Sequence, residues 1–396
     1  MAEIGLHILF LADQILGRDE INSLRALFQG LEQLGYSWRL ICCCAEPDHG
    51  FDSVVESRGL SRRWQRPWAI RGLDLGAHST RPRLLHVLSA NMDEIGLEIS
   101  ERWRIPYVLS VDEFPRRNSK IRLSRFWCRG LIAINHELAA MLNREFHIPA
   151  THLQEIARAV TNFGPQTRRA RAGRVPVIGS AGPLVTSSGF STFLNAARKV
   201  IDSGVDAEFL IAGHGEDEAD LRRRADRLRI AERLTIADEI PDGLTFWDVL
   251  DVYCQTSVSP TVGRSLLLAM ASGVPSIATD VEGLRSHVRE GETGLIVPHG
   301  DSNALAHAIL KLLEDHDLSE RLGEAGRREV RRSHDPSLEI KSLDLLYRGI
   351  VEAGLGPRDV GLENRASHFD ITNGLDSARV APGSSTAVIP GFVPEV

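Results

Sequence analysis

Residues 259–283 read "SPTVGRSLLLAMASGVPSIATDVEG", and their pattern decides the fold of the second half of the chain. The apolar run at 266–270, a Gly-Val-Pro turn and the stretch "SIAT" at 276–279 predict a short helix that leads into a buried strand. In open parallel sheets, ligands bind beyond the carboxyl ends of such strands. This stretch nevertheless holds no carboxylate before Asp280, so a helix start that should face a ligand lacks acidic side chains.

The same alternation of apolar strand patterns and amphipathic helix patterns extends in both directions from this stretch. We expect buried strands at residues 6–12, 37–44, 83–90, 105–112, 130–135, 175–181, 207–213, 234–238, 252–255, 275–280 and 293–298. We expect helices at residues 21–34, 92–104, 137–146, 303–315, 318–332 and 336–353. This rhythm predicts an α/β protein with doubly wound parallel sheets.

A stretch rich in glycine, proline and arginine, residues 162–176, interrupts the alternation and divides the chain into two Rossmann-like domains. The expected division is an N-terminal domain at 1–163, a linker at 164–174, a C-terminal domain at 175–335, a helix at 336–354 that crosses back to the first domain, and a tail at 355–396. The tail is predicted to lack fixed structure, because its apolar residues recur at no helical or strand period.

Composition excludes several classes of function. With 396 residues, 43% of them hydrophobic and 25% charged, the chain is expected to be a soluble globular protein with a large core. A formal net charge of -7 argues against a general nucleic-acid binder. The basic cluster at Arg168, Arg169, Arg171 and Arg174 is interpreted as a solvated linker, with peripheral contact to a membrane or another anionic surface as the alternative.

Localisation and cofactors follow from what the sequence lacks. No stretch reaches about 18 uncharged apolar residues, so no transmembrane segment is expected. The five cysteines show no paired zinc-type spacing, which indicates a reduced, cytoplasmic protein. No Asp-x-Asp pair lies near an expected strand end, so neither a metal nor a cofactor is predicted.

Two segments of the second half identify a family. They read "SGVPSIATDVEGLRSHVREGETGLIVPHGDSNALAHAI" at 272–309 and "IAGHGEDEADLRRRADRLRIAERLTIAD" at 211–238. Both closely resemble the donor domain of family-4 retaining glycosyltransferases, which have the two-domain GT-B fold. Residues 182–200 continue this resemblance, and a weaker, collinear one extends through the first half. The resemblance implies transfer of a hexosyl group from a nucleotide-diphosphate sugar, as co-substrate, to a glycan or lipid acceptor.

Several positions that carry the chemistry in that family hold other residues here. Two family glutamates, which contact the donor sugar and the ribose hydroxyls, are replaced by Pro260 and Leu268, whose side chains offer no acceptor. The arginine and lysine that neutralise the departing diphosphate are replaced by Pro183 and Ser188. Asp112 stands where the family has a histidine near the sugar. By analogy with oxyanion donors, each lost group would lower the rate by about 10² to 10³.

Other positions are candidate substrate contacts: Gly17, Gly182, Arg158, His214, Gly263, Arg264 and Glu282. Arg158-Ala159 stands where the family has an asparagine-glycine turn. Arg264 follows Gly263 at an expected helix start, where free N–H groups favour an anion, so it is a candidate for a relocated diphosphate cation. For Arg158, Arg264 and His214, the alternative is a surface charge or a histidine in a turn.

Three hypotheses of function remain after these replacements. The chain is either an active hexosyltransferase with altered donor contacts, or a non-catalytic binding or regulatory protein that keeps the fold. A GT-B enzyme of another reaction, such as an epimerase, has no positive motif in the sequence.

Overall fold

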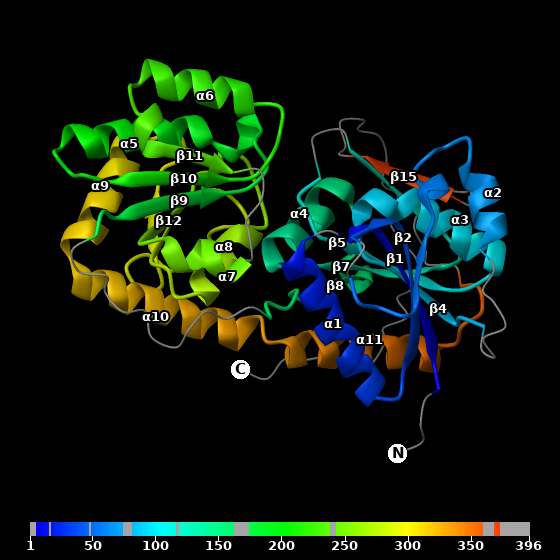
Figure 1. The fold of residues 1–396 in the computed structure, drawn as a ribbon. Helices are drawn as coiled ribbons and strands as arrows, with labels where there is room; N and C mark the ends of the chain where they lie inside the picture. The colour runs from blue at the N-terminus through cyan, green and yellow to red at the C-terminus, as the bar shows by residue number, and fades with distance from the viewer. Residues whose placement is uncertain are drawn as a thin grey trace.

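The computed structural model describes residues 5–15, 17–46, 49–73, 81–115, 119–161, 174–237, 243–358 and 368–372. They form two α/β domains, each built on a parallel sheet flanked by helices (Figure 1). The strand order is β3-β2-β1-β4-β5-β7-β8 in the N-terminal sheet and β11-β10-β9-β12-β13-β14 in the C-terminal sheet. The predicted fold class, two doubly wound parallel-sheet domains, is therefore confirmed.

The N-terminal domain follows the expected alternation and adds short elements that the sequence pattern did not indicate. Its strands are β1 (His7–Ile15), β2 (Ser37–Ala45), β3 (Val54–Glu56), β4 (Leu84–Val87), β5 (Tyr107–Val111), β6 (Lys120–Ser124), β7 (Cys128–Ala133) and β8 (Leu153–Glu155). Its helices are α1 (Arg18–Gln33), α2 (Arg66–Gly72), α3 (Asp93–Trp103) and α4 (His136–Phe146), with 3₁₀ turns η1 (Arg58–Leu60), η2 (Ala90–Met92) and η3 (Ala150–His152).

The central strand β1 shows why the strands of this sheet have continuous apolar runs in their sequences. Its side chains alternate between the two faces of the sheet, as in every strand. Ile8 and Phe10 enter the core that includes helices α1 and α11, whereas Leu9 and Leu11 enter the core that includes α3 and α4. Because helices cover both faces, every position of the strand centre is buried and apolar.

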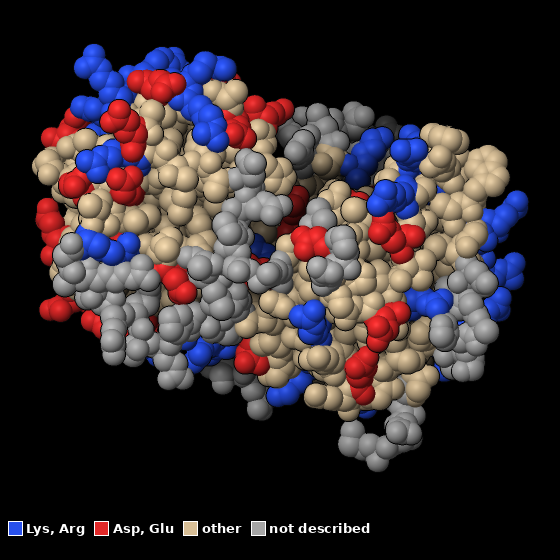
Figure 2. All heavy atoms as spheres, viewed as in Figure 1, with Lys and Arg blue, Asp and Glu red and all other residues tan. Residues whose placement is uncertain are grey.

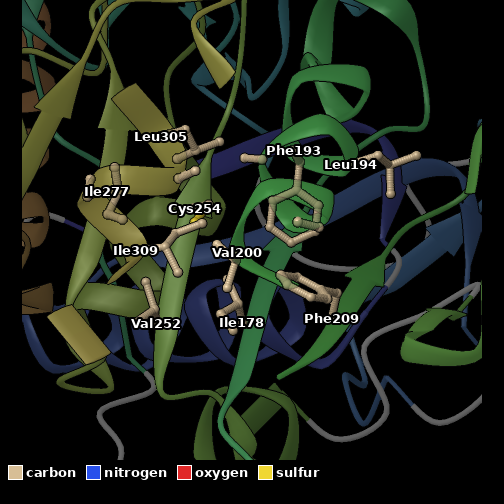
Figure 3. Close-up of a cluster of buried hydrophobic side chains, with 14 of the residues drawn as sticks. Ile178, Phe193, Leu194, Val200, Phe209, Val252, Cys254, Ile277, Leu305 and Ile309 are labelled. Carbon is tan, nitrogen blue, oxygen red and sulfur yellow. The ribbon is translucent and has the colours of Figure 1, made fainter. Parts of the chain in front are cut away.

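The C-terminal domain repeats this plan. Its strands are β9 (Val177–Ala181), β10 (Glu208–Ala212), β11 (Leu234–Ala237), β12 (Val252–Gln255), β13 (Ser276–Thr279) and β14 (Leu295–Val297). Its helices are α5 (Phe190–Asp202), α6 (Glu218–Arg227), α7 (Gly243–Val249), α8 (Arg264–Ala271), α9 (Ser302–Glu314) and α10 (His316–Ser333), with turns η4 (Thr186–Ser188) and η5 (Ala231–Arg233). Figure 3 shows one core, where Phe193 of α5 lies edge-to-face on Phe209 of β10 with 6.0 Å between ring centroids.

The helix α11 (Pro336–Ala353) follows α10 and packs against α1 of the first domain (Figure 1). Its Tyr347 hydroxyl lies 2.6 Å from Nδ1 of His86, and Nε2 of His86 lies 2.8 Å from the Ser110 hydroxyl. Burial lowers the pKa of His86 to about 3, so this ring is neutral and one of its nitrogens donates while the other accepts. A buried hydrogen-bond chain thus links the last long helix to the first sheet.

One segment of the C-terminal tail has a fixed structure. Strand β15 (His368–Thr372) pairs antiparallel with β6, from His368 opposite Ser124 to Thr372 opposite Lys120. The prediction that 355–396 lacks structure is therefore wrong for these five positions, because the ladder to β6 supplies backbone partners that the tail sequence alone does not show. The rest of the tail beyond residue 372 and nearly all of the expected linker lie outside the described residues.

A helix crosses a bilayer only when it is both long and predominantly apolar. Among the described residues, no helix combines the length and the apolar character needed to cross a membrane.

Replacing Tyr347 with phenylalanine should lower the free energy of unfolding by about 1–3 kcal/mol, because a buried His86 nitrogen loses its partner. Urea denaturation followed by circular dichroism measures the change. The control is Leu345→Ala on the same helix, where the side chain is 55% exposed and the expected change is within about 0.5 kcal/mol. Equal losses in both variants would contradict a special role for the Tyr347–His86 contact.

Candidate functional site

The candidate site lies where the two domains meet. Phe114, which follows β5, lies against Gly283, and the backbone N–H of Gly283 donates to the Glu137 carboxylate at the start of α4. Segments that follow strands of the first sheet thus contact the loop that follows β13 of the second. Figure 2 shows the molecule hollowed between the domains, with acidic and basic side chains inside the hollow. In α/β folds, this is the edge of the sheet where ligands bind.

Helix α8 points its amino end into this junction. It begins after Gly263, which has a φ of 67°, a left-handed conformation that glycine adopts without strain. A Cβ atom there would collide with the Leu284 side chain, and no side chain among the described residues caps the helix. The quoted stretch thus folds as predicted, and its helix presents backbone N–H groups rather than carboxylates.

Arg264, the first residue of α8, reaches across to the first domain. Its guanidinium donates to the Ser23 hydroxyl of α1 at 2.9 Å and to the Ala159 carbonyl at 3.3 Å. Burial lowers its pKa to about 10, with a further lowering by Arg158, while Asp19 and Glu339 act in the opposite direction. Arg264 therefore remains charged near neutral pH and bridges the two domains in this structure.

Two carboxylates complete a charged cluster around this contact. Nη1 of Arg158 lies 3.8 Å from Oδ2 of Asp112, and the Glu339 carboxylate of α11 accepts from the Ala159 N–H at 2.8 Å. Burial raises the pKa of both carboxyl groups, and the charge of Arg158 acts against that rise. Oδ1 of Asp112 is buried and has no hydrogen-bond partner among the described residues. The Ser89 side chain and the Ala90 N–H act on the same carboxyl group and lower its pKa, so Oδ1 is the one oxygen left to accept from a ligand or water.

A small internal cavity adjoins the cluster. Its volume is about 20 Å³, enough for about one water molecule. Its polar lining combines Ser23, Arg158 and Glu339 with His86 and Ser110 of the hydrogen-bond chain to α11. The cavity thus connects the domain junction with the buried polar groups of the first sheet.

Two histidines of the C-terminal domain lie beside the cluster. Nδ1 of His334 lies 3.1 Å from the Arg158 carbonyl oxygen, and Nε2 of His287 lies 2.9 Å from the Val262 carbonyl oxygen. Their ring centroids are 5.6 Å apart. Burial lowers the pKa of both, to about 4 for His287. Both rings are therefore neutral at neutral pH, and each can donate to its carbonyl partner.

Gly182, Pro183 and Ser188 lie in the second domain after β9, and His214 follows β10. The Ser188 hydroxyl donates to the Pro183 carbonyl at 2.6 Å, which closes the turn on itself. Gly189, with a φ of 72°, starts α5 so close to the Thr256 carbonyl that a Cβ atom would collide with it. Gly182 begins this loop, and His214 has an exposed side chain while its carbonyl accepts from the Leu184 N–H at 2.8 Å.

The remaining predicted positions are distributed around the junction. Pro260 is exposed, whereas Leu268 is only 6% exposed and belongs to an apolar core cluster. The Gly17 N–H donates to Glu46 at 2.7 Å just before α1. Glu282 lies 3.8 Å from Arg144 of α4, a contact between the domains. The structure thus brings Asp112, Arg158 and Arg264 into one cluster, with Gly263 at its edge.

The sequence did not single out several residues of the domain junction: Ser23, Glu137, His287, His334 and Glu339. Each is an isolated polar residue in an amphipathic helix pattern or a loop, and no local spacing distinguishes it from a solvated side chain. In the part of the chain that the structure describes, no three His, Cys, Asp or Glu side chains gather as a metal site would require.

Residues 175–315 match the family described as "Glycosyl transferases group 1". A phosphatidyl-myo-inositol mannosyltransferase of Mycobacterium leprae is 35% identical over 169 residues, which are 42% of this chain and 44% of that protein. A capsular polysaccharide biosynthesis glycosyltransferase of Staphylococcus aureus is 27% identical over 182 residues, which are 46% of this chain and 48% of that protein. The chain thus spans about half the length of the curated relatives it matches.

The structural likeness extends over both domains. The Anabaena protein HepE, solved in complex with UDP-glucose, superposes with a TM-score of 0.70 at 15% sequence identity. The match covers 87% of this chain and 100% of that chain. The C-terminal domain therefore carries the sequence features of the glycosyltransferase group 1 family, and the whole arrangement is that of GT-B glycosyltransferases.

Lowering the pH should destabilise the wild-type protein relative to a His287→Gln variant. The folded pKa of His287, about 4, lies below its ordinary value of 6.5, so between these values the unfolded chain binds a proton that the folded chain does not. As the pH falls through this window, the unfolded chain gains a proton on His287 that the folded chain does not bind. This lowers the free energy of unfolding of the wild type by up to about 1.4 kcal/mol per pH unit. Urea titrations at a series of pH values through this window measure the difference.

The control for this experiment is His299→Gln, at an exposed position in a turn. Its free energy of unfolding should stay within about 0.5 kcal/mol of the wild type, as for other surface substitutions. A stability difference between His287→Gln and the wild type that does not change with pH would contradict a lowered pKa of His287 in the folded protein.

Proposed function

We propose that this protein is a retaining, family-4-type glycosyltransferase that transfers a hexosyl group from a nucleotide-diphosphate sugar to a glycan or lipid acceptor. The match of residues 175–315 to the glycosyltransferase family and the two-domain fold support this class of reaction. The donor contacts differ from those that the resemblance implies, so the sugar and diphosphate are recognised by other groups at the domain junction.

The observation that best supports a ligand at the junction is the unpartnered oxygen of Asp112. A buried acceptor without a partner costs free energy comparable to a lost hydrogen bond, and a sugar hydroxyl would satisfy it. Asp112 follows β5 at the carboxyl end of the sheet, and by the resemblance it stands where a histidine contacts the sugar. Arg158, 3.8 Å away, keeps a positive charge beside this acceptor.

The amino end of α8 supplies the second part of the proposed site. Its uncapped N–H groups and the helix dipole favour an anion, and Arg264 adds a positive charge at the same end. In this structure the Arg264 guanidinium is bound to the first domain. A diphosphate would therefore interact with the backbone of α8 directly, or with Arg264 after a change of its side-chain rotamer.

A non-catalytic binding or regulatory protein is the second candidate function, and Leu268 favours it. The side chain is buried among the apolar residues of α8, so no carboxylate is available there for the ribose hydroxyls. Pro260, Pro183 and Ser188 likewise carry no charge to replace the family's donor contacts. On this hypothesis the fold persists while turnover is lost.

A thermal-shift screen with uridine, guanosine and adenosine diphosphates and their hexose conjugates tests the proposal. A ligand at about 100 times its dissociation constant adds about 2.7 kcal/mol to the stability of the folded state. We expect one nucleotide sugar to raise the melting temperature, because the Asp112 oxygen gains a hydroxyl donor. The Asp112→Ala variant should lose most of this shift, whereas Asp226→Ala, an exposed aspartate of α6, should retain it.

Turnover is measured separately, as release of nucleoside diphosphate from the conjugate that gives the shift. Release above the rate without protein supports the transferase. A shift without release favours the non-catalytic candidate, and no shift with any conjugate contradicts donor binding altogether.

A further inference from the structure

Two tryptophans of the first domain are exposed in a way that packing does not explain. Trp64 is 70% exposed and Trp68 is 69% exposed, the highest values among the large hydrophobic side chains that the structure describes. Tryptophan has a large apolar ring that is mostly buried in folded proteins. Side chains of this kind on a surface indicate a contact with a partner.

Both tryptophans lie on one outward face of a short helical segment. The turn at 62–65 leads directly into α2, because the Arg66 N–H donates to the Arg62 carbonyl at 3.0 Å. Trp64, Trp68 and Arg71 follow one another at intervals of four and three residues, so they share a helical face. The opposite face buries Arg66 and Ile70 against the domain. The exposed face is therefore held in place by a packed inner face.

The segment is strongly basic. Residues 57–73 contain Arg58, Arg62, Arg63, Arg66 and Arg71 and no acidic residue, in a chain whose net charge is -7. Arg58 pairs with Glu56 at 2.7 Å, and Arg63 and Arg66 pair with Glu94 at 3.3 Å and 2.8 Å. Arg62 and Arg71 are exposed and form no ion pair with the described residues. Figure 2 shows basic side chains at this edge of the domain, where Figure 1 places α2.

We propose that the tryptophan–arginine surface, defined as Arg62, Trp64, Trp68 and Arg71, docks the protein on an anionic lipid membrane. Indole rings are enriched at the interface between headgroups and acyl chains, where their apolar body and N–H group are both accommodated. Arginines near an anionic leaflet add electrostatic attraction. A short helix with tryptophans and arginines on its outer face has the composition of an interfacial membrane anchor.

Charge distinguishes this occupant from the alternatives. In a symmetric contact with a second copy of the chain, the same arginines would face one another and repel. Nucleic acid would require a larger basic surface to offset the net charge of -7. An anionic bilayer instead matches both the positive charge and the apolar rings. This inference does not depend on the proposed function, because membrane contact requires neither donor nor acceptor.

Cosedimentation of the full chain with vesicles tests the proposal. We expect binding to vesicles of phosphatidylglycerol and phosphatidylcholine and no binding to pure phosphatidylcholine, with a blue shift of tryptophan emission on binding. Each arginine near an anionic surface strengthens binding about fivefold. The double variant Arg62→Gln/Arg71→Gln should therefore weaken vesicle binding about thirtyfold. Trp64→Ser/Trp68→Ser should weaken binding and abolish the blue shift.

Two controls match these variants. Arg102→Gln/Arg227→Gln removes the same charge from exposed positions of α3 and α6, and Leu338→Ser/Leu345→Ser removes exposed apolar side chains from α11. Both should bind vesicles like the wild type.

Equal binding to both kinds of vesicle, unchanged binding of the tryptophan–arginine variants, or binding only to duplex RNA or a protein partner would overturn the proposal. Nucleotide-sugar binding is measured without vesicles, so the two proposals fail independently.

Discussion

The junction between the domains depends on how the partly buried guanidinium of Arg264 is satisfied. A buried charge is tolerated only when hydrogen bonds and opposite charges replace its water shell. Here its hydrogen-bond partners are the Ser23 hydroxyl and the Ala159 carbonyl, both from the first domain. Glu339 binds the N–H of the same residue 159, and Glu339 comes from α11. Three segments far apart in the sequence therefore meet at residue 159.

This arrangement also determines the chemistry available in the cleft. Arg264 is occupied by contacts within the protein, whereas one oxygen of Asp112 is left without a partner. The junction therefore holds one unmet acceptor, which suits a sugar hydroxyl, beside the uncapped N–H groups of α8, which suit a phosphate. Leu268, buried in the apolar face of α8, contributes to stability rather than to recognition.

The positions of the main strands and helices could be predicted from the sequence because burial on two faces leaves a strong periodic signal. The expected strand at 276–279 and the helix before it, for example, correspond to β13 and α8. The short strands β3 and β8 and the helix α2 have few residues, so their periodic signal is weak. Strand β15 was missed because its stability comes from pairing with β6, more than 200 residues earlier in the chain.

The sequence by itself determined the two α/β domains, the glycine turns at 182 and 263, and the absence of carboxylates at 260 and 268. These features are local: they depend on side-chain type, period and backbone freedom. Only the tertiary structure decided that Arg264 bridges the domains, that Asp112 faces Arg158, and that His287 and His334 lie together. Such contacts depend on which strand ends and helix ends meet across the junction, and no pattern along a single segment encodes that meeting.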